Sequence, residues 1–475
     1  MNRLLAVLTT VALFLSFAIS LHATVAQFDG ATQLAFDANE DIEPAAISQM
    51  RGSDEYTVVV NMKLQPDATV GVGTQLAATV VYPGGVVPVT IPTSPSYDTY
   101  ADPALAKDDG APGQPIYLAA LGVKLNPDGS LDSAVLVWIS TNGGLSWSAP
   151  VLADAKNTNI DHVQLDKPSI AAGLPTGPRA TRMVYVAYIS ASSIAGGQNE
   201  VKVRSSATGS WWLSSPVLTV SGATISGYPS YNQAPTVVGD TTNGDVYVVW
   251  TRAHQGTGAP QEGIHARKAS ATSPQLAFTL PEGPVIATGD LFGTGQGVTL
   301  GQSGVGFVKV KAVTVPIARF DSVAKRLSIT WHEAGVGGTA VRLAASTFGR
   351  PWQYDMLSSG SIDLQPSLDI DPYGNCLVTW YHFYAPAGST LQSRFLQSAT
   401  YVTFPGGLTP QHDDTLTYGF ESDITAYQAE AGSGNRLLGE YHDVTFSNGT
   451  FKSSAIVINT VSGQGDPWLY ILSHP

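Results

Sequence analysis

A set of polar residues closely follows the second strand of several repeated strand pairs in this chain. Arg252 comes after the apolar run 246–250, and two further polar pairs come after runs that end in Trp331 and Trp380. Equivalent strand ends of a repeat fold meet on one face, and guanidinium, imidazole, carboxylate and phenol groups gathered around a depression are typical of a small-molecule or sugar pocket. The predicted ligand-binding residues are Arg252, His332, Glu333, Tyr381, His382, Tyr441 and His442.

The same face is expected to collect the residues that precede the first strand of each pair. Asp102, Lys167 and Gln365 stand there, each directly before a proline. The alternative interpretation is that all these polar residues are solvated loop residues, or strand ends whose polar groups are satisfied by neighbouring backbone. No catalytic residue is assigned, no cofactor is expected, and no metal site is predicted, because the acidic turn 126–129 lacks the ligand series of a calcium loop.

The elements that must position these residues form a repeat. Each copy has a polar residue, a proline and an alternating apolar strand, then a turn and a second strand that ends in an aromatic residue. Successive copies lie about 66 residues apart on average, which is the size of four antiparallel strands with their loops. The copies are marked by Pro44, Pro103, Pro168, Pro235, Pro316, Pro366 and Tyr441. The prediction is an all-β chain, a β-propeller of four-stranded antiparallel blades. Seven blades are favoured and six remain open, whereas a linear array of sandwiches fits less well because no linker separates the copies.

One hairpin supports this architecture. In the segment 140–147 the pair Asn142-Gly143 is a strong two-residue turn signal, and Trp147 brings an apolar face that can pack beneath the turn. The segment resembles the Asp-box of sialidase-type propellers, the BNR repeat, with Asn142 where that family has Asp and Ser146 where it has Thr. Weaker copies lie at 205–212 and 346–352, although an ordinary Trp-containing hairpin is the alternative for one copy alone. The residues given a structural role are Ser140, Asn142, Gly144, Ser146 and Trp147.

The resemblance implies that this hairpin joins the third and fourth strands of a blade, away from the ligand face. It also implies that a working sialidase would clamp its substrate carboxylate with three arginines. Arg252 suits one of these positions, but Arg319 and Arg394 have no supporting motif, and an Arg-Ile-Pro type segment is missing. We therefore expect a sialidase-like propeller that binds a glycan or cell-surface ligand without the full catalytic set. The alternatives are a divergent glycoside hydrolase that works through Glu333 and a second carboxylate, and a purely structural role.

The N-terminal segment and the composition predict where the protein is located and which partners it lacks. Residues 1–26 read as a signal peptide, with an uncleaved anchor as the alternative, so we expect one propeller domain over 27–475 that is secreted, either extracellular or periplasmic. A net charge of −13 argues against nucleic acid and anionic membranes as partners. Only 13% of the residues are charged, while Gly (48) and Pro (30) are plentiful, which suits short strands and turns. The single Cys376 lies in an apolar run and is expected to be buried. The oligomeric state is left undefined.

Overall fold

The fold is described from a computed structural model, in which the chain is built almost entirely of β-strands. The structure describes residues 26–34, 41–64, 74–176, 181–194, 197–207, 209, 212, 217–221, 230–254, 263–270, 277–278, 286–287, 291, 297–303, 306–335, 337–347, 350–405, 409–426, 435–436, 441–458 and 465–473. Within these ranges the only helix is a single 3₁₀ turn, η2 (Ile424–Ala426), and no helix there is long and apolar enough to cross a membrane. The all-β prediction is confirmed. The predicted signal peptide lies outside the described residues except for Ala26.

Antiparallel units of four strands follow one another along the chain. The first contains β2 (Asp41–Arg51), β3 (Asp54–Leu64), β4 (Thr74–Tyr82) and β5 (Gly85–Val89). The second contains β6 (Thr99–Lys107), β7 (Ile116–Leu125), β8 (Leu131–Ser140) and β9 (Val151–Asn157). The next contains β10 (Val163–Thr176), β11 (Thr181–Ser192), β12 (Asn199–Ser206) and β13 (Leu218–Thr219). It is followed by β14 (Ser230–Gly239), β15 (Val246–His254) and β16 (Gly263–Ser270), with β17 (Ala277–Phe278) and β18 (Ile286–Ala287) both paired to β16.

The C-terminal half continues the pattern, and its long strand β24 (Gln353–Ile370) serves two units. Its first part ends a unit with β21 (Ile317–Asp321), β22 (Arg326–Gly335) and β23 (Gly338–Ser346). Its last part opens a unit with β25 (Cys376–Tyr384), β26 (Arg394–Thr403), β27 (Gln411–His412) and β28 (Leu416–Asp423). The final unit contains β30 (Asp443–Ser447), β31 (Thr450–Ile458), β32 (Gly465–Ser473) and the N-terminal strand β1 (Gln27–Gln33). A separate small sheet contains β19 (Gly297–Ser303), β20 (Gly306–Lys311) and β29 (Asn435–Arg436).

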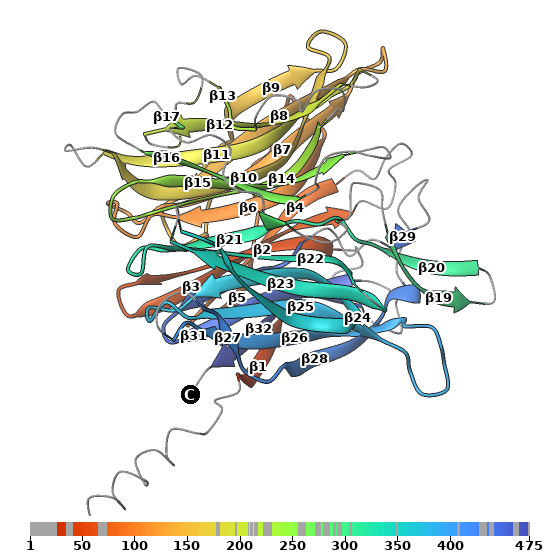
Figure 1. Cartoon of the computed structure of the whole chain (residues 1–475). Coiled ribbons are helices and arrows are strands. Elements are labelled where there is room, and N and C mark those ends of the chain that lie inside the picture. The colour runs from red at the N-terminus through yellow and green to blue at the C-terminus, as the bar shows by residue number, and fades with distance from the viewer. Residues whose placement is uncertain are drawn as a thin grey trace, which may run out of the picture.

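The first strand of each unit lies next to the first strands of its neighbours. β2, β6, β10, β14, β21, β24 and β30 contact one another in that order, and β30 in turn contacts β2. The first and last described strands meet in the last unit, where β1 pairs antiparallel with β32, and Figure 1 shows these strands side by side. The ring of first strands is therefore continuous, and the N-terminal strand supplies the fourth strand of the C-terminal unit.

Large apolar side chains fill the spaces within and between the units. Trp138, Trp250, Trp331 and Trp380 come from four different units, and each is at most 2% exposed. Strands buried on both faces read as nearly continuous apolar runs, as Val58-Val59-Val60 in β3 does. Cys376 is also fully buried, as expected from its apolar run. This packing holds the ring of first strands in place from outside.

The predicted structural hairpin joins β8 to β9, the third and fourth strands of its unit. Asn142 Oδ1 accepts hydrogen bonds from the Ser140 hydroxyl (2.9 Å) and the Ser146 amide (3.0 Å), and the Gly144 amide donates to Ser140 Oγ (2.9 Å). The Trp147 side chain is buried in the core between this unit and the preceding one. The two weaker copies follow β12 and β23, which are also third strands, although residues 208, 210–211 and 348–349 of these copies lie outside the described residues.

Candidate functional site

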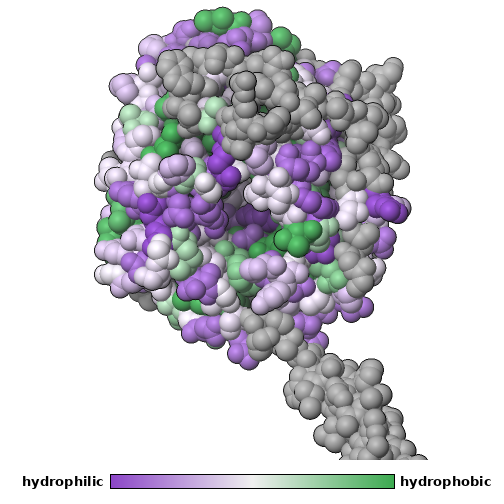
Figure 2. Space-filling view, turned by 90° about the vertical axis from the view of Figure 1, so that its left-hand side faces the viewer, coloured by the Kyte–Doolittle hydropathy of each residue, from purple (hydrophilic) through white to green (hydrophobic). Residues whose placement is uncertain are grey.

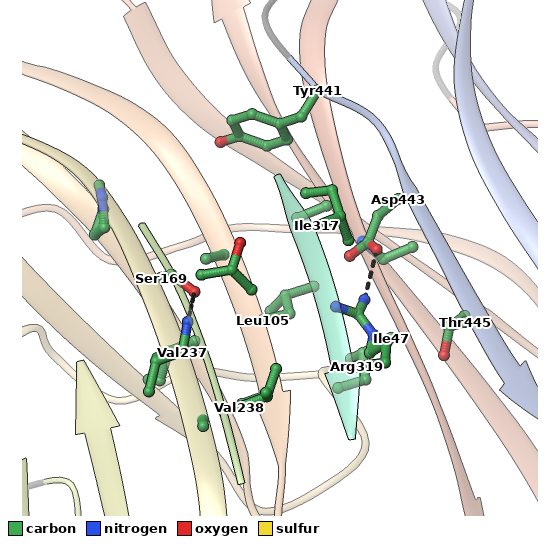
Figure 3. Close-up of a pocket in the computed structure, with 18 of the residues that line it drawn as sticks. Ile47, Leu105, Ser169, Val237, Val238, Ile317, Arg319, Tyr441, Asp443 and Thr445 are labelled. Carbon is green, nitrogen blue, oxygen red and sulfur yellow. Dashed lines mark hydrogen bonds and ion pairs between the residues drawn. The ribbon is translucent and has the colours of Figure 1, made fainter. Parts of the chain in front are cut away.

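The ring of first strands encloses a cavity of about 300 Å³. All of these strands contribute lining residues, so the cavity lies along the axis of the ring (Figure 3). The face of the molecule drawn in Figure 2 is hollowed near its centre, with hydrophilic and hydrophobic side chains around the hollow. A cavity of this size is at the lower end of the range of ligand pockets, roughly 300 to 1,000 Å³.

A repeated β-bulge shapes one end of this cavity. Five first strands shift register at a proline, and the residue before the proline has a φ between +47° and +54°. These residues are Glu43 in β2, Asp102 in β6, Lys167 in β10, Ala234 in β14 and Gln365 in β24. A left-handed conformation costs a non-glycine residue roughly 1–2 kcal/mol, and such strain is concentrated at functional sites. The proline recognised in the sequence and the residue before it are thus the two residues of the bulge, and that preceding residue is polar in four of the five strands.

Three of these bulge residues form an ion cluster, which we call the bulge cluster: Glu43, Asp102 and Lys167. The Lys167 ammonium lies 2.6 Å from Asp102 Oδ1 and 3.8 Å from Glu43 Oε1, and the side chains are only 16%, 7% and 4% exposed. Tyr441, which precedes β30, joins them: its hydroxyl donates to the Pro103 carbonyl (3.0 Å), and its ring centroid lies 5.8 Å from Lys167 Nζ. Charged groups from three neighbouring units and one aromatic ring therefore meet at this end of the cavity.

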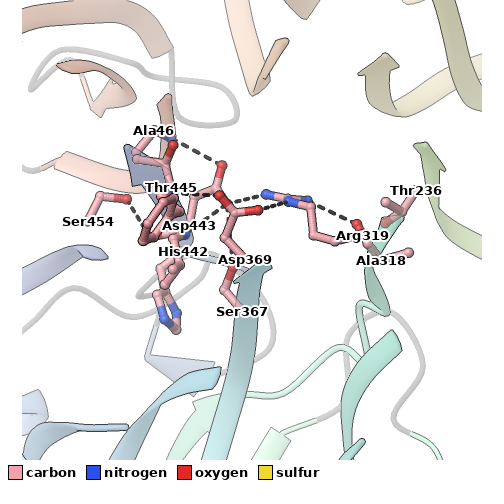
Figure 4. A network of polar contacts seen from close by, with 12 residues as sticks. Ala46, Thr236, Ala318, Arg319, Ser367, Asp369, His442, Asp443, Thr445 and Ser454 are labelled. Atoms are coloured by element: carbon pink, nitrogen blue, oxygen red, sulfur yellow. Dashed lines mark hydrogen bonds and ion pairs between the residues drawn. The ribbon is translucent and has the colours of Figure 1, made fainter. Parts of the chain in front are cut away.

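A second ion cluster lies on the opposite arc of the ring, and we call it the arginine cluster: Arg319, Asp369 and Asp443. Arg319 Nε lies 3.3 Å from Asp369 Oδ1, and Arg319 Nη2 lies 2.9 Å from Asp443 Oδ1 (Figure 4). The backbone fixes both carboxylates, because the Ala46 amide donates to Asp443 (3.2 Å) and the Phe446 amide donates to Asp369 (2.6 Å). The cluster links β21, β24 and β30 and faces the cavity.

Burial acts on the pKa values of Arg319 and Asp443 in opposite directions. Burial lowers the pKa of Arg319, but the Asp443 and Asp369 carboxylates outweigh it, so the pKa is raised and the guanidinium stays charged. Burial raises the pKa of Asp443, and Arg319 only partly counteracts this. Burial therefore outweighs the effect of the guanidinium at Asp443.

The cavity is amphipathic. Figure 3 shows Arg319 and Asp443 on one side and Val237 and Val238, from β14, on the other. Leu105 in β6 adds to the apolar lining, and Ser169 is held by the Val237 amide, which donates to its hydroxyl at 3.1 Å. Figure 3 also shows Ile47 and Ile317 beside Arg319 and Asp443, so a ligand that fits would meet apolar and polar groups close to one another.

Two of the seven residues predicted to bind ligand line this cavity, Tyr441 and His442. His442 is 1% exposed and its Nε2 lies 2.8 Å from the Thr379 hydroxyl. Burial lowers the pKa of His442 to about 3, so the ring is neutral at physiological pH. It contributes shape and hydrogen-bonding capacity to the cavity wall but no charge.

The other five predicted residues lie outside the cavity lining. Arg252, His332, Glu333 and Tyr381 are at most 3% exposed and hydrogen-bond within the protein. Arg252 Nε donates to Asn232 (3.2 Å), and His332 Nδ1 accepts from the Gln365 amide (3.2 Å). Glu333 accepts from Trp331 (3.0 Å) and Arg342 (2.8 Å). The Tyr381 hydroxyl accepts from the Ile456 amide (2.9 Å). His382 is partly exposed and contacts Asp363 (2.7 Å). They surround the ring of first strands without reaching its axis.

Among the charged residues that line the cavity, Asp369, Asp443 and Lys107 were not predicted as site residues. Asp369 lies four residues after the bulge residue Gln365, within the apolar alternation of its strand, and a charged residue at such an inward position was the available signal. Across the described residues, no group of three or more His, Cys, Asp or Glu side chains is placed to hold a metal ion.

Comparisons with known proteins are limited to solved structures, since neither a protein family nor a curated protein matches the sequence. A protein of unknown function from Dyadobacter fermentans is 14% identical, with 95% of this chain and 99% of that chain covered and a TM-score of 0.49. The Penicillium chrysogenum α-L-arabinanase, solved with arabinobiose, is 13% identical over 75% and 93% of the chains, with a TM-score of 0.46. A Trypanosoma rangeli sialidase mutant displaying trans-sialidase activity is 9% identical over 95% and 60%, with a TM-score of 0.40. Similarity at this level leaves function to be argued from the site itself.

Proposed function

We propose that this chain is an exported seven-bladed β-propeller that binds a short glycan in its axial cavity. Seven blades are supported by the cyclic order of contacts among the first strands, with β30 beside β2. The N-terminal apolar segment supports export, and a single domain over 27–475 is supported by the pairing of β1 with β32. The Ser140–Trp147 hairpin supports a relationship to Asp-box propellers through its position after the third strand.

One observation carries the binding function: charged bulge residues from successive units converge with Tyr441 at the end of a cavity of about 300 Å³. Carboxylate and ammonium groups can accept from and donate to sugar hydroxyls, and an aromatic ring offers a flat apolar face. The strained backbone that presents these groups recurs in five units, which supports a functional reason for keeping it.

A glycan array followed by calorimetry with two lysine variants tests this function. Lys167→Met removes the ammonium of the bulge cluster, whereas Lys309→Met removes an exposed ammonium from β20, outside the ring. We expect an array sugar that binds the wild type, at least about tenfold weaker binding by Lys167→Met, and unchanged binding by Lys309→Met. Equal loss in both variants, or no sugar bound by the wild type, would contradict the proposal.

A second candidate is glycoside hydrolysis in the same cavity, favoured by two carboxylates, Asp369 and Asp443, that share Arg319 at the cavity wall. Glycosidases use a pair of carboxyl groups, one of which donates a proton, and burial raises the pKa of Asp443. Hydrolysis of an aryl glycoside that Asp443→Asn abolishes would support this activity. A panel of aryl glycosides, including a sialoside, left intact by the wild-type protein would argue against it.

A further inference from the structure

Two of the cations at the cavity are each shared by two carboxylates. Arg319 is shared by Asp369 and Asp443, and Lys167 is shared by Asp102 and Glu43. The third lining cation, Lys107, contacts Asp109 at 3.2 Å and donates to the Ser48 carbonyl at 2.7 Å. Every cation among the described lining residues is therefore already engaged by a carboxylate.

This arrangement discriminates between ligand charges. An anionic sugar would have to displace a protein carboxylate from Lys167 or Arg319, leaving that carboxylate partly buried and without its partner. A cationic group would instead approach carboxylates that share one cation, in a site shielded from water, where Coulomb interactions are stronger than in bulk solvent. The local charge therefore favours a cation and disfavours a second anion.

The arginine cluster is where an added cation would be stabilised most. Its side chains are 28% (Arg319), 21% (Asp369) and 17% (Asp443) exposed, so a ligand can reach them from the cavity. The pKa of Asp443 is raised by burial in spite of Arg319, which is the behaviour of a carboxylate with too little positive charge nearby. Asp443 already accepts from Arg319, the Ala46 and Val444 amides and the Ser367 hydroxyl, whereas Asp369 accepts from Arg319 and the Phe446 amide. Because a carboxylate has about four lone-pair sites, a further donor would be accepted by Asp369, next to Asp443.

We propose that the ligand is an amino sugar whose protonated amine lies beside Asp369 and Asp443. Its ring then lies against apolar lining residues such as Leu105, Val237 and Val238. This inference rests on the proposed glycan binding and adds the chemical class of the sugar. The ammonium donates up to three hydrogen bonds, each strengthened by charge on both partners.

Two disaccharides of nearly the same shape test the inference. A β-1,4-linked glucosamine disaccharide carries amines where cellobiose carries hydroxyls, and both are titrated by calorimetry near pH 6, where most sugar amines are protonated. We expect the glucosamine disaccharide to bind at least about tenfold tighter. Asp443→Asn and Asp369→Asn should each reduce that ratio severalfold, and Asp54→Asn, at an exposed turn position, should preserve it.

The outcomes separate this inference from the function on which it rests. Equal or tighter binding of cellobiose would overturn the amine site while leaving glycan binding intact. A ratio that survives both Asp443→Asn and Asp369→Asn would also overturn it, because the amine would then lie elsewhere. If neither disaccharide nor any array sugar bound, glycan binding itself would be wrong. The comparison of the two sugars uses the wild-type protein and does not depend on the folding of a variant.

Discussion

Two buried histidines predict that this protein loses stability in mild acid. Burial lowers the pKa of His332 and of His442 to about 3, whereas the ordinary value is 6.5. Both rings are thus neutral in the folded state at pH values where the unfolded chain protonates them. Because the unfolded state binds more protons between these values, stability is fully present above pH 6.5 and declines as the pH falls toward 3.

The magnitude follows from linkage. Each histidine contributes a slope of about 1.4 kcal/mol per pH unit once the pH is well below 6.5, so acidification to pH 4.5 costs roughly 2.5 kcal/mol per ring. The two together would remove about 5 kcal/mol, which is the entire stability of many domains. Carboxylates such as Asp161, whose pKa the Asn157 amide lowers, act at lower pH, near and below the ordinary value of 3.8.

The assay is urea denaturation at half-unit steps from pH 7.5 to 4.5. His332→Asn and His442→Asn should each reduce the pH slope of the unfolding free energy by about half, even though each variant is less stable at pH 7.5. His412→Asn is the matched control, because His412 is 36% exposed and contacts Asp355 at the surface. If His332→Asn and His442→Asn kept the wild-type slope, the conclusion that both rings are buried and neutral would be refuted.

Two further predictions concern the packing of the ring. Gly144→Ala should destabilise the protein by about 2–4 kcal/mol in urea denaturation, because the φ of Gly144 is +87° and an added Cβ would lie 2.4 Å from Val58. Gly129→Ala is the control and should cost about 1 kcal/mol, because Gly129 has a similar φ of +82° but open space around it. Equal costs would contradict the packing of the hairpin on the neighbouring unit. Lys452→Met should lower the free energy of unfolding by about 2 kcal/mol, because Lys452 contacts Glu55 (2.6 Å) between the last and first units and the two side chains are only 7% and 19% exposed. Lys202→Met should lower it by under about 1 kcal/mol, because its partner Glu200 is 46% exposed. A larger loss for Lys202→Met than for Lys452→Met would contradict the contact between the last and first units.

The first strands could be predicted from the sequence because their signal is local. A polar residue, a proline and an alternating apolar run recur at a near-constant spacing, and five of the marked prolines lie in bulges of first strands. The contribution of β1 to the last unit could not be predicted. Gln27–Gln33 pairs with Gly465–Ser473 at the other end of the chain, and only the closed ring brings those segments together.

The cavity was harder to predict than the fold. Arg252, His332, Glu333 and Tyr381 lie in second strands, one strand removed from the axis, so their side chains pack between strands and units. Most of the residues that line the axis belong to first strands, and in five of these strands a bulge at the proline shifts the alternation of side chains. A sequence pattern shows that a strand alternates, but it does not show how a bulge shifts that alternation.

Glycan binding in the axial cavity can be tested by a crystal structure of the protein soaked with the tightest-binding oligosaccharide from the array. We expect ordered sugar density in the axial cavity, with polar contacts to Asp102 or Lys167 at the bulge cluster and to Asp443 at the arginine cluster. Sugar density on the outer edge of a unit or on the face of the Ser140–Trp147 hairpin, with the axial cavity empty, would contradict it.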